Sequence, residues 1–318
     1  MYKYSGFLYL YSVAGVNRVL QTIALTESKV YHMEADKLNK GHIIYVDGSA
    51  LKTVDTTSGS ITLIAGKATN HGFKESSNIQ KALFHHITGF VQAKMSDRCT
   101  AVLVVDAGNN CIRYILRNKN NTVGTLAGRC GTVGGFTDNA YMRYAMFDRP
   151  QNIIIDRLNP KRFIVTDRDN HALRSITLNG KFSRGSVATL VKSDELLYEP
   201  QGIIQDRRSG DFIVSIAHAI VRVWQSHSKS HYLTVLAGSN GGYGWKIDKT
   251  FEKSSFNYPG DIMPLNKGGV SPMLIAGNNL HLMKEDRVVT LCDGDGKSKR
   301  FMYSSECNIT NPTSLLAL

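Results

Sequence analysis

Residues 149–191 contain four short strings in order: RPQNIIID (149–156), FIVTDR (163–168), LRSITL (173–178) and ATLV (188–191). Each string is rich in β-branched or large apolar residues, and polar or glycine-containing segments separate them, as in strands joined by turns. The apolar runs are nearly continuous, which suits strands covered on both faces. This stretch therefore predicts a unit of four antiparallel β-strands.

The unit recurs along the chain at a period of about 50 to 60 residues, which is typical of a repeat architecture. A four-stranded sheet cannot bury both faces alone, and a closed ring of such sheets gives every unit two neighbours. We therefore predict an all-β, six-bladed β-propeller as a single domain over residues 1–318. First strands are expected in the strings KVYHMEAD (29–36), HITGFVQA (86–93), RPQNIIID (149–156), EPQGIIQD (199–206), YPGDIMPL (258–265) and NPTSLLAL (311–318).

The chain ends supply the sixth blade in this interpretation. The segment 311–318 is a first strand with no second strand after it, whereas FLYLYS (7–12) and NRVLQT (17–22) resemble a second and a third strand. We therefore expect 311–318 to join residues 1–28, so that pairing between the N- and C-terminal strands closes the ring.

The composition fits a folded domain. Hydrophobic residues make up 42% of the chain and charged residues 20%, which provides a core and shows no signature of disorder. No apolar run is long enough for a membrane-spanning helix. The N-terminal string lacks a basic region and a small-residue cleavage site, so we interpret it as a strand.

Several segments resemble the NHL repeat, whose units contain Asp-x-x-Asn-x-x-Ile-Arg, Leu-Ala-Gly and Phe-x-x-Pro. The matching segments are DAGNNCIRYI (106–115), TLAG (125–128), GGFTDNAYMRYAMFDRPQNIIID (134–156), DRDNHALRSI (167–176) and, more loosely, AGSNGGYGWKIDKTFEKSSFNYPGDI (237–262). The resemblance implies a propeller, but it leaves the function open because propellers of this family serve unrelated activities. Some of them bind RNA on a basic face.

Cysteines and glycosylation sequons favour the secretory pathway. Cys111 opens a third strand and Cys130 follows the neighbouring fourth strand, so we predict a disulfide between them. We predict a second disulfide between Cys292 and Cys307, and Cys99 would remain free. Sequons at Asn120 and Asn308 fall in predicted turns or loops, as expected for glycosylation sites of an extracellular protein. The alternative is a cytoplasmic protein with five ordinary thiols.

The formal net charge of +12 is spread over the blades rather than concentrated in one run. Such a surface favours acidic partners in general. We expect a protein or acidic glycan partner, and nucleic acid is the alternative.

The channel of a propeller is lined by its first strands. Aligning the units on the proline places one residue per blade at the second position after it: His32, Gly89, Asn152, Gly202, Asp261 and Ser314. Six-bladed lyases use three histidines and a metal there, a pattern that this chain lacks. Asn152 and Asp261 are weak candidates for cation ligands, but such residues more often hold channel water. We predict no catalytic residue, metal or cofactor, and keep a metal-dependent hydrolase or lyase as an alternative.

The longest segments between predicted blades are 66–85, 128–148 and 238–257. Exposed aromatic residues beside Arg or Lys are typical of binding surfaces, although the same rings can instead pack beneath the loops and cap the blades. We predict a non-catalytic binding module, part of a larger secreted or cell-surface protein; a cytoplasmic RNA- or protein-binding domain is the alternative. The candidate binding residues are Phe136, Tyr141, Arg143, Tyr144, Tyr243, Trp245 and Lys246.

Overall fold

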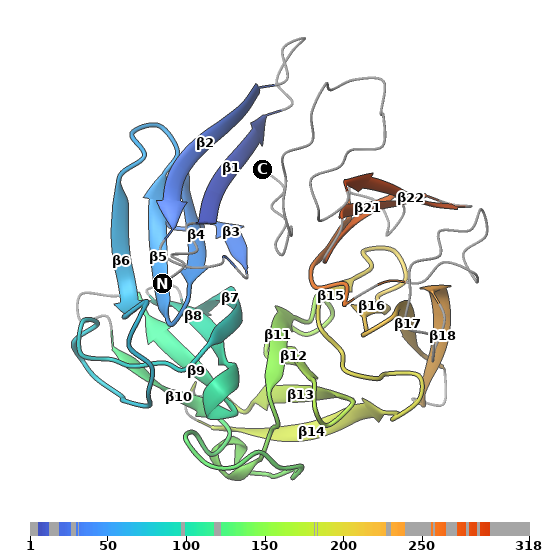
Figure 1. Cartoon of the computed structure of the whole chain (residues 1–318). Helices are drawn as coiled ribbons and strands as arrows, with labels where there is room; N and C mark the ends of the chain where they lie inside the picture. The colour runs from blue at the N-terminus through green and yellow to red at the C-terminus, as the bar shows by residue number, and fades with distance from the viewer. Residues whose placement is uncertain are drawn as a thin grey trace.

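Five four-stranded antiparallel sheets, here called blades 1 to 5, are arranged around a common centre in the computed structural model (Figure 1). In each blade the strands follow one another in sequence order from the centre outward. The predicted four-strand unit is therefore confirmed five times over. The structure describes residues 6–12, 19–26, 30, 32–96, 99–117, 122–180, 182, 184–226, 230–238, 256, 258–264, 272–277, 280–284 and 287–292.

The strand bounds follow the predicted strings closely. Blade 1 comprises β3 (Met33–Ala35), β4 (His42–Asp47), β5 (Ala50–Asp55) and β6 (Ile61–Gly66). Blade 2 comprises β7 (Ile87–Ser96), β8 (Cys99–Asp106), β9 (Cys111–Leu116) and β10 (Val123–Ala127). Blade 3 comprises β11 (Pro150–Ile155), β12 (Arg162–Asp167), β13 (Ala172–Leu178) and β14 (Gly185–Lys192).

Blade 4 comprises β15 (Ile203–Gln205), β16 (Phe212–Ser215), β17 (Ala219–Gln225) and β18 (His231–Gly238). Blade 5 comprises β19 (Ile262–Pro264), β20 (Met273–Ala276), β21 (Leu280–Lys284) and β22 (Arg287–Cys292). Two short 3-10 turns, η1 (Ala107–Asn109) and η2 (Met142–Tyr144), lie beside blades 2 and 3.

A further antiparallel pair, β1 (Gly6–Ser12) and β2 (Val19–Thr26), lies where the sequence predicts two N-terminal strands. Their proposed partner, residues 311–318, lies outside the described residues. The closure of the ring by the two chain ends therefore remains a prediction.

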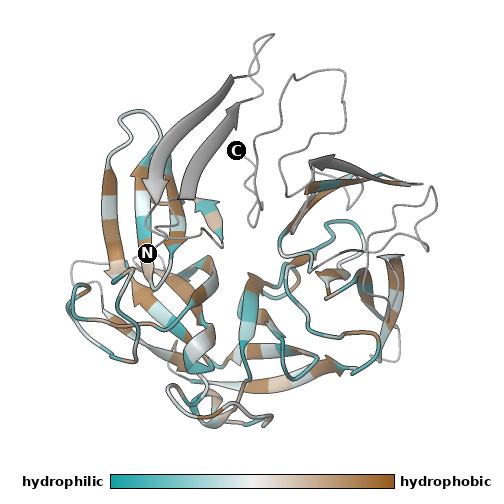
Figure 2. Cartoon of the chain, in the orientation of Figure 1, coloured by the Kyte–Doolittle hydropathy of each residue, from teal (hydrophilic) through white to brown (hydrophobic). Residues whose placement is uncertain are grey.

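Hydrophobic residues recur along the strands of the blades (Figure 2), and buried apolar side chains pack between neighbouring blades. Between blades 2 and 3, Leu103, Phe147 and Val165 belong to one buried cluster. Between blades 3 and 4, Leu173 and Val214 belong to another. Each fully buried side chain of this size contributes about 1.5 to 3 kcal/mol, so the blades depend on one another for stability.

Two hydroxyl groups tie consecutive blades together near the channel. The backbone N–H of Asn152 donates to Thr166 Oγ1 (2.8 Å), which in turn donates to the carbonyl of Gln201 in the next blade (2.8 Å). One blade further on, Ser215 Oγ likewise accepts from the N–H of Gly202 (2.8 Å) and donates to the carbonyl of Gly260 (2.7 Å).

Candidate binding surface on the loop between blades 2 and 3

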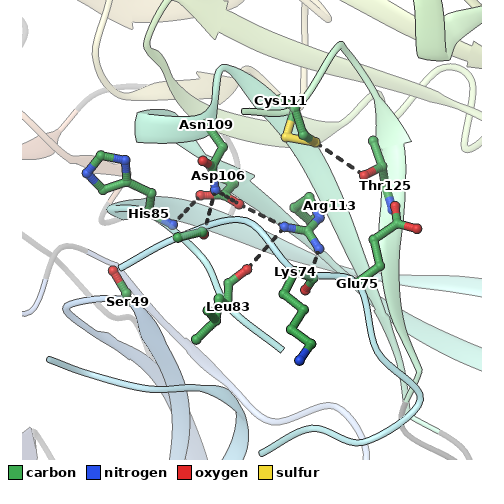
Figure 3. A network of polar contacts seen from close by, with 12 residues as sticks. Ser49, Lys74, Glu75, Leu83, His85, Asp106, Asn109, Cys111, Arg113 and Thr125 are labelled. Carbon is green, nitrogen blue, oxygen red and sulfur yellow. Dashed lines mark hydrogen bonds and ion pairs between the residues drawn. A yellow bond between two sulfur atoms is a disulfide. The ribbon is translucent and has the colours of Figure 1, made fainter. Parts of the chain in front are cut away.

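A buried ion pair anchors the loop that enters blade 2 (Figure 3). Arg113 on β9 and Asp106 at the end of β8 are fully buried, and Arg113 Nη1 lies 3.0 Å from Asp106 Oδ2. Asn109 Nδ2 donates to the same oxygen (2.8 Å), and the N–H of His85 donates to Oδ1 (2.7 Å). Arg113 also donates to the carbonyls of Leu83, Lys74 and Gly124. One side chain thus fixes both arms of loop 66–85.

The same network recurs in blade 3 and anchors loop 128–148. Arg174 is fully buried, its Nη1 lies 2.7 Å from Asp167 Oδ2, and its Nη2 lies 2.7 Å from Asp138 Oδ1. It also donates to the carbonyls of Met146 and Thr137 (3.0 and 2.9 Å). Burial raises the pKa of Asp106 and of Asp167 to about 6, although the surrounding donors oppose the rise.

Aromatic rings cover both guanidinium groups. The carbon Cζ of Arg174 lies 4.7 Å from the centre of the Phe136 ring and 5.2 Å from that of Phe147. Arg113 has the equivalent contacts with Phe73 (4.7 Å) and Phe84 (5.1 Å). These contacts are cation–π interactions. Phe136 therefore caps its blade, as the alternative interpretation of the loop aromatics expects, yet it stays 43% exposed.

Each anchored loop also protects the outer edge of its blade. Asn139 and Val187 of β14 exchange backbone hydrogen bonds, as do Ser76 and Val123 of β10. The carboxylate of Asp138 accepts from the N–H of Thr189 (2.9 Å). These loops thus cover part of an edge strand that otherwise exposes unpaired backbone groups.

Blade 4 has apolar residues at the two positions of the ion pair. The strand register places Ile216 and Val221 where blade 3 has Asp167 and Arg174. The segment that enters blade 4 is short, since it runs from Lys192 at the end of β14 to Ile203 at the start of β15. Leu197 in this segment packs in the same apolar cluster as Ile216 and Val221. Apolar packing, rather than a buried ion pair, therefore holds the connection that enters blade 4.

A disulfide holds the first part of loop 128–148. The sulfurs of Cys111 and Cys130 are bonded, as the sequence predicts, and the two Cα atoms lie 5.1 Å apart. Cys99, expected to be free, is a free thiol. Loop 128–148 is therefore fastened to blade 2 by the disulfide and to blade 3 by Arg174.

This doubly fastened loop exposes three of the predicted binding residues around η2. Met142 is buried between blades 2 and 3, whereas Tyr141 and Tyr144 are 72% and 58% exposed. The two tyrosine rings lie nearly perpendicular, with centres 6.3 Å apart. The side chain of Arg143 is also exposed, and its Nη2 lies 3.2 Å from Glu75. We call Tyr141, Arg143 and Tyr144 the rim site.

Several other predicted site residues lie outside the part of the chain that the structure describes. Tyr243, Trp245 and Lys246 lie outside the described residues, as do the sequons at Asn120 and Asn308. The predicted Cys292–Cys307 disulfide stays a prediction, because Cys307 and the side chain of Cys292 lie outside what the structure describes.

The channel side chains bond to their own strands. Asn152 Oδ1 accepts from the N–H of Ile153 (2.8 Å), and Asp261 Oδ1 accepts from the N–H of Ile262 (3.0 Å). Burial would lower the pKa of His32, but Glu34 and Asp261 outweigh it and raise that pKa. Within the described ranges, no three His, Cys, Asp or Glu side chains are placed to hold a metal ion.

The comparisons with known proteins support the fold. No protein-family model matches the chain, and a search of curated proteins finds no match. Among solved structures, an auxiliary nutrient binding protein from Bacteroides ovatus is similar, with a TM-score of 0.63 and 14% identity over 91% of this chain. An auxiliary nutrient binding protein from Bacteroides thetaiotaomicron has a TM-score of 0.61 and 11% identity over 92% of this chain.

The chain spans 64% of the length of each of these two proteins. At such low identity the likeness establishes the architecture alone: the chain is a β-propeller of four-stranded antiparallel blades. No helix in the part of the chain that the structure describes is long and apolar enough to cross a membrane.

Proposed function

We propose that this chain is a non-catalytic binding module whose rim site contacts a protein or an acidic glycan. The observation that carries the proposal is the exposure of Tyr141 and Tyr144 on a loop that is fastened at two points. A surface fixed in advance loses little conformational freedom on binding, which favours affinity. Aromatic residues and arginine are also the side chains that most often dominate binding energy.

An acidic glycan fits the rim site best. Sugar rings pack on exposed aromatic rings through their C–H faces, and a guanidinium binds carboxylate or sulfate groups with two parallel hydrogen bonds. Arg143, between the two tyrosines in the sequence, supplies that group, and a bound anion would replace the exposed carboxylate of Glu75, which lies 3.2 Å from its Nη2. The net charge of +12 attracts polyanions over a longer range.

Two further features support a location outside the cytoplasm and a binding role. Disulfides such as Cys111–Cys130 persist mainly in oxidising compartments. The names of the two similar Bacteroides structures describe nutrient-binding proteins. We retain the NHL-repeat resemblance as part of the proposal. It is supported by the repeated Asp–Asn–Arg networks of blades 2 and 3, in which Asn170 Nδ2 donates to Asp167 (2.9 Å) as Asn109 donates to Asp106.

A glycan array that includes neutral, uronic-acid and sulfated oligosaccharides tests the proposal. We expect the purified chain to retain acidic glycans, and the double variant Tyr141→Ala, Tyr144→Ala to lose that retention. Tyr232→Ala is the matched control, because Tyr232 is an exposed tyrosine on β18 of blade 4. Equal retention by the wild type and the double variant would contradict the rim site.

A further inference from the structure

Glu75 links loop 66–85 to the rim site. Its Oε1 accepts from the backbone N–H of Thr125 on β10 (2.8 Å; Figure 3) and lies 3.2 Å from Arg143 Nη2. Both side chains of this ion pair are partly exposed, Arg143 at 57% and Glu75 at 40%. A carboxylate of the chain itself therefore contacts the guanidinium that the rim site offers to an acidic ligand.

The equivalent acidic residue in blade 3 is Asp138. Glu75 and Asp138 each immediately precede the residue that bridges to the outermost strand of the blade. Each also accepts from the backbone N–H of a threonine on that strand, and in blade 3 this donor is Thr189 (2.9 Å). The two carboxylates therefore occupy the same position in the repeated unit.

From this shared position the two carboxylates reach different arginines. Asp138 Oδ1 lies 2.7 Å from Nη2 of Arg174, the buried arginine of its own blade. Glu75 lies in the loop whose carbonyls accept from the buried Arg113, but it forms its ion pair with Arg143 in the loop that enters the next blade. The longer side chain of glutamate suits a contact outside its own blade. Glu75 is thus directed to the rim site.

The ion pair is formed at neutral pH and is open to displacement. Burial would raise the pKa of Glu75, but the hydrogen bonds from Thr125 and the charge of Arg143 outweigh burial and lower that pKa. Glu75 is therefore a carboxylate at neutral pH. Exposed ion pairs are weak, and a carboxylate or sulfate that binds a guanidinium with two parallel hydrogen bonds can replace one.

We propose that Glu75 is a built-in competitor at the rim site: it occupies Arg143 in the free protein, and the anionic group of an acidic ligand displaces it. This inference rests on the function proposed for the rim site. Displacement breaks the Glu75–Arg143 contact, so Glu75 lowers the affinity for every ligand that binds Arg143. A glycan also packs on Tyr141 and Tyr144, which offsets this cost. Glu75 thus selects an acidic group carried by a sugar over a small free anion.

Calorimetric titration with a tetramer of galacturonic acid, beside the neutral tetramer of galactose, tests this role. Glu75→Gln removes the competing charge, so we expect it to bind the acidic tetramer roughly two- to fivefold more tightly than the wild type does, the range of an exposed ion pair. Its affinity for the neutral tetramer should not increase, because a neutral sugar does not need to displace Glu75.

Two further variants separate displacement from a general change of charge. Glu75→Asp keeps the charge but shortens the side chain, so it should keep the Thr125 contact, release Arg143 and bind the acidic tetramer more tightly, as Glu75→Gln does. Asp55→Asn is the matched control. It removes one carboxylate that lies 3.8 Å from His42 in blade 1, and it should leave the affinity unchanged.

A sulfate titration followed by the Arg143 Nε–H NMR signal tests the competition without a glycan. Sulfate should bind Glu75→Gln more tightly than the wild type, by a factor similar to that for the acidic tetramer. If neither protein binds the tetramer while the sulfate result holds, the function proposed for the rim site is contradicted and the role of Glu75 is supported.

Three results would overturn the role of Glu75. Equal sulfate affinities of Glu75→Gln and the wild type would show that Glu75 does not compete with anions. Weaker binding by Glu75→Gln would show that the ion pair positions Arg143 for the ligand instead. Wild-type affinity in Glu75→Asp, with tighter binding in Glu75→Gln, would show a general effect of charge.

Discussion

At the scale of single residues, Arg174 determines whether loop 128–148 has a fixed shape. Its guanidinium is fully buried and bonds to two carboxylates and two loop carbonyls. A buried charge with this many partners strongly destabilises the fold when one partner is removed, because the remaining groups stay buried without partners.

We expect Arg174→Leu to lower the free energy of unfolding by about 3 to 5 kcal/mol, since it leaves Asp167 buried without its counter-ion. Urea denaturation measures the loss. The exposed control Arg208→Leu should change stability by less than about 0.5 kcal/mol.

The double variant Asp167→Ile, Arg174→Val copies the residues of blade 4 into blade 3. Replacing a buried ion pair by apolar residues is often neutral. Here we expect a net loss, because the carbonyls of Thr137 and Met146 lose their donor as well. A double variant as stable as the wild type would show that the pair does not anchor the loop.

The free energy of unfolding should depend on pH because of the buried His281. The strand register places His281 of blade 5 where blade 3 has Arg174, and burial lowers its pKa from 6.5 to about 4. Above pH 6.5 the residue is neutral in both the folded and the unfolded chain. As the pH falls from 6.5 to 4 the unfolded chain takes up a proton first, so stability declines, by up to about 3 kcal/mol.

Replacing the histidine, as in His281→Leu, should remove this decline. The measurement is the free energy of unfolding at pH 7.0 and at pH 4.5 for both proteins. Asp106 and Asp167 titrate in the same range but are common to both proteins, so their contribution cancels in the difference. Parallel pH profiles would show that His281 is not the group responsible.

At the scale of elements, the sequence predicts the strands well and the loops poorly. Strings such as VLVV (102–105) identify inner strands because both faces are buried, so every residue is apolar. The pairing of Asn139 with Val187 leaves no periodic signal, because one bridge joins segments far apart in the chain. The positive φ of Arg149 is also unexpected, since residues before proline are usually extended.

The rim site, too, was predictable from the sequence in part: its residue types were, but the packing around them was not. The residue types of Tyr141, Arg143 and Tyr144 suffice to predict exposed aromatic rings beside an arginine on that loop, and their exposure is confirmed. That Met142 turns inward between the exposed Tyr141 and Arg143, and that Phe136 packs on Arg174, depends on tertiary contacts that no local pattern contains.

The disulfide should contribute to the stability of the domain and restrict the first part of loop 128–148. Removing it with Cys111→Ala, Cys130→Ala should cost about 3 kcal/mol by the loop-closure entropy of a crosslink with a sequence separation of 19. Hydrogen exchange should accelerate in residues 128–136 and remain slow near 137–148, where Arg174 still binds the loop. Equally faster hydrogen exchange over the whole loop would mean that the Arg174 contacts do not hold residues 137–148 once the disulfide is removed.

At the scale of the whole molecule, the blades stabilise one another through their shared faces, so the ring should respond as a unit. We propose that residues 311–318 complete a sixth blade with β1 and β2. Deleting these residues should then open the ring and lower the melting temperature of the entire domain, as followed by calorimetry. An unchanged melting transition would contradict closure by the chain ends.

We propose that the partner binds to the fixed loop between blades 2 and 3. The most direct measurement is the calorimetric affinity of the acidic glycan that the array retains best, for the wild type, Tyr141→Ala and Tyr232→Ala. A loss of about tenfold or more, equivalent to about 1.4 kcal/mol, is expected for Tyr141→Ala, with Tyr232→Ala unchanged. Equal affinities for all three proteins would contradict the claim.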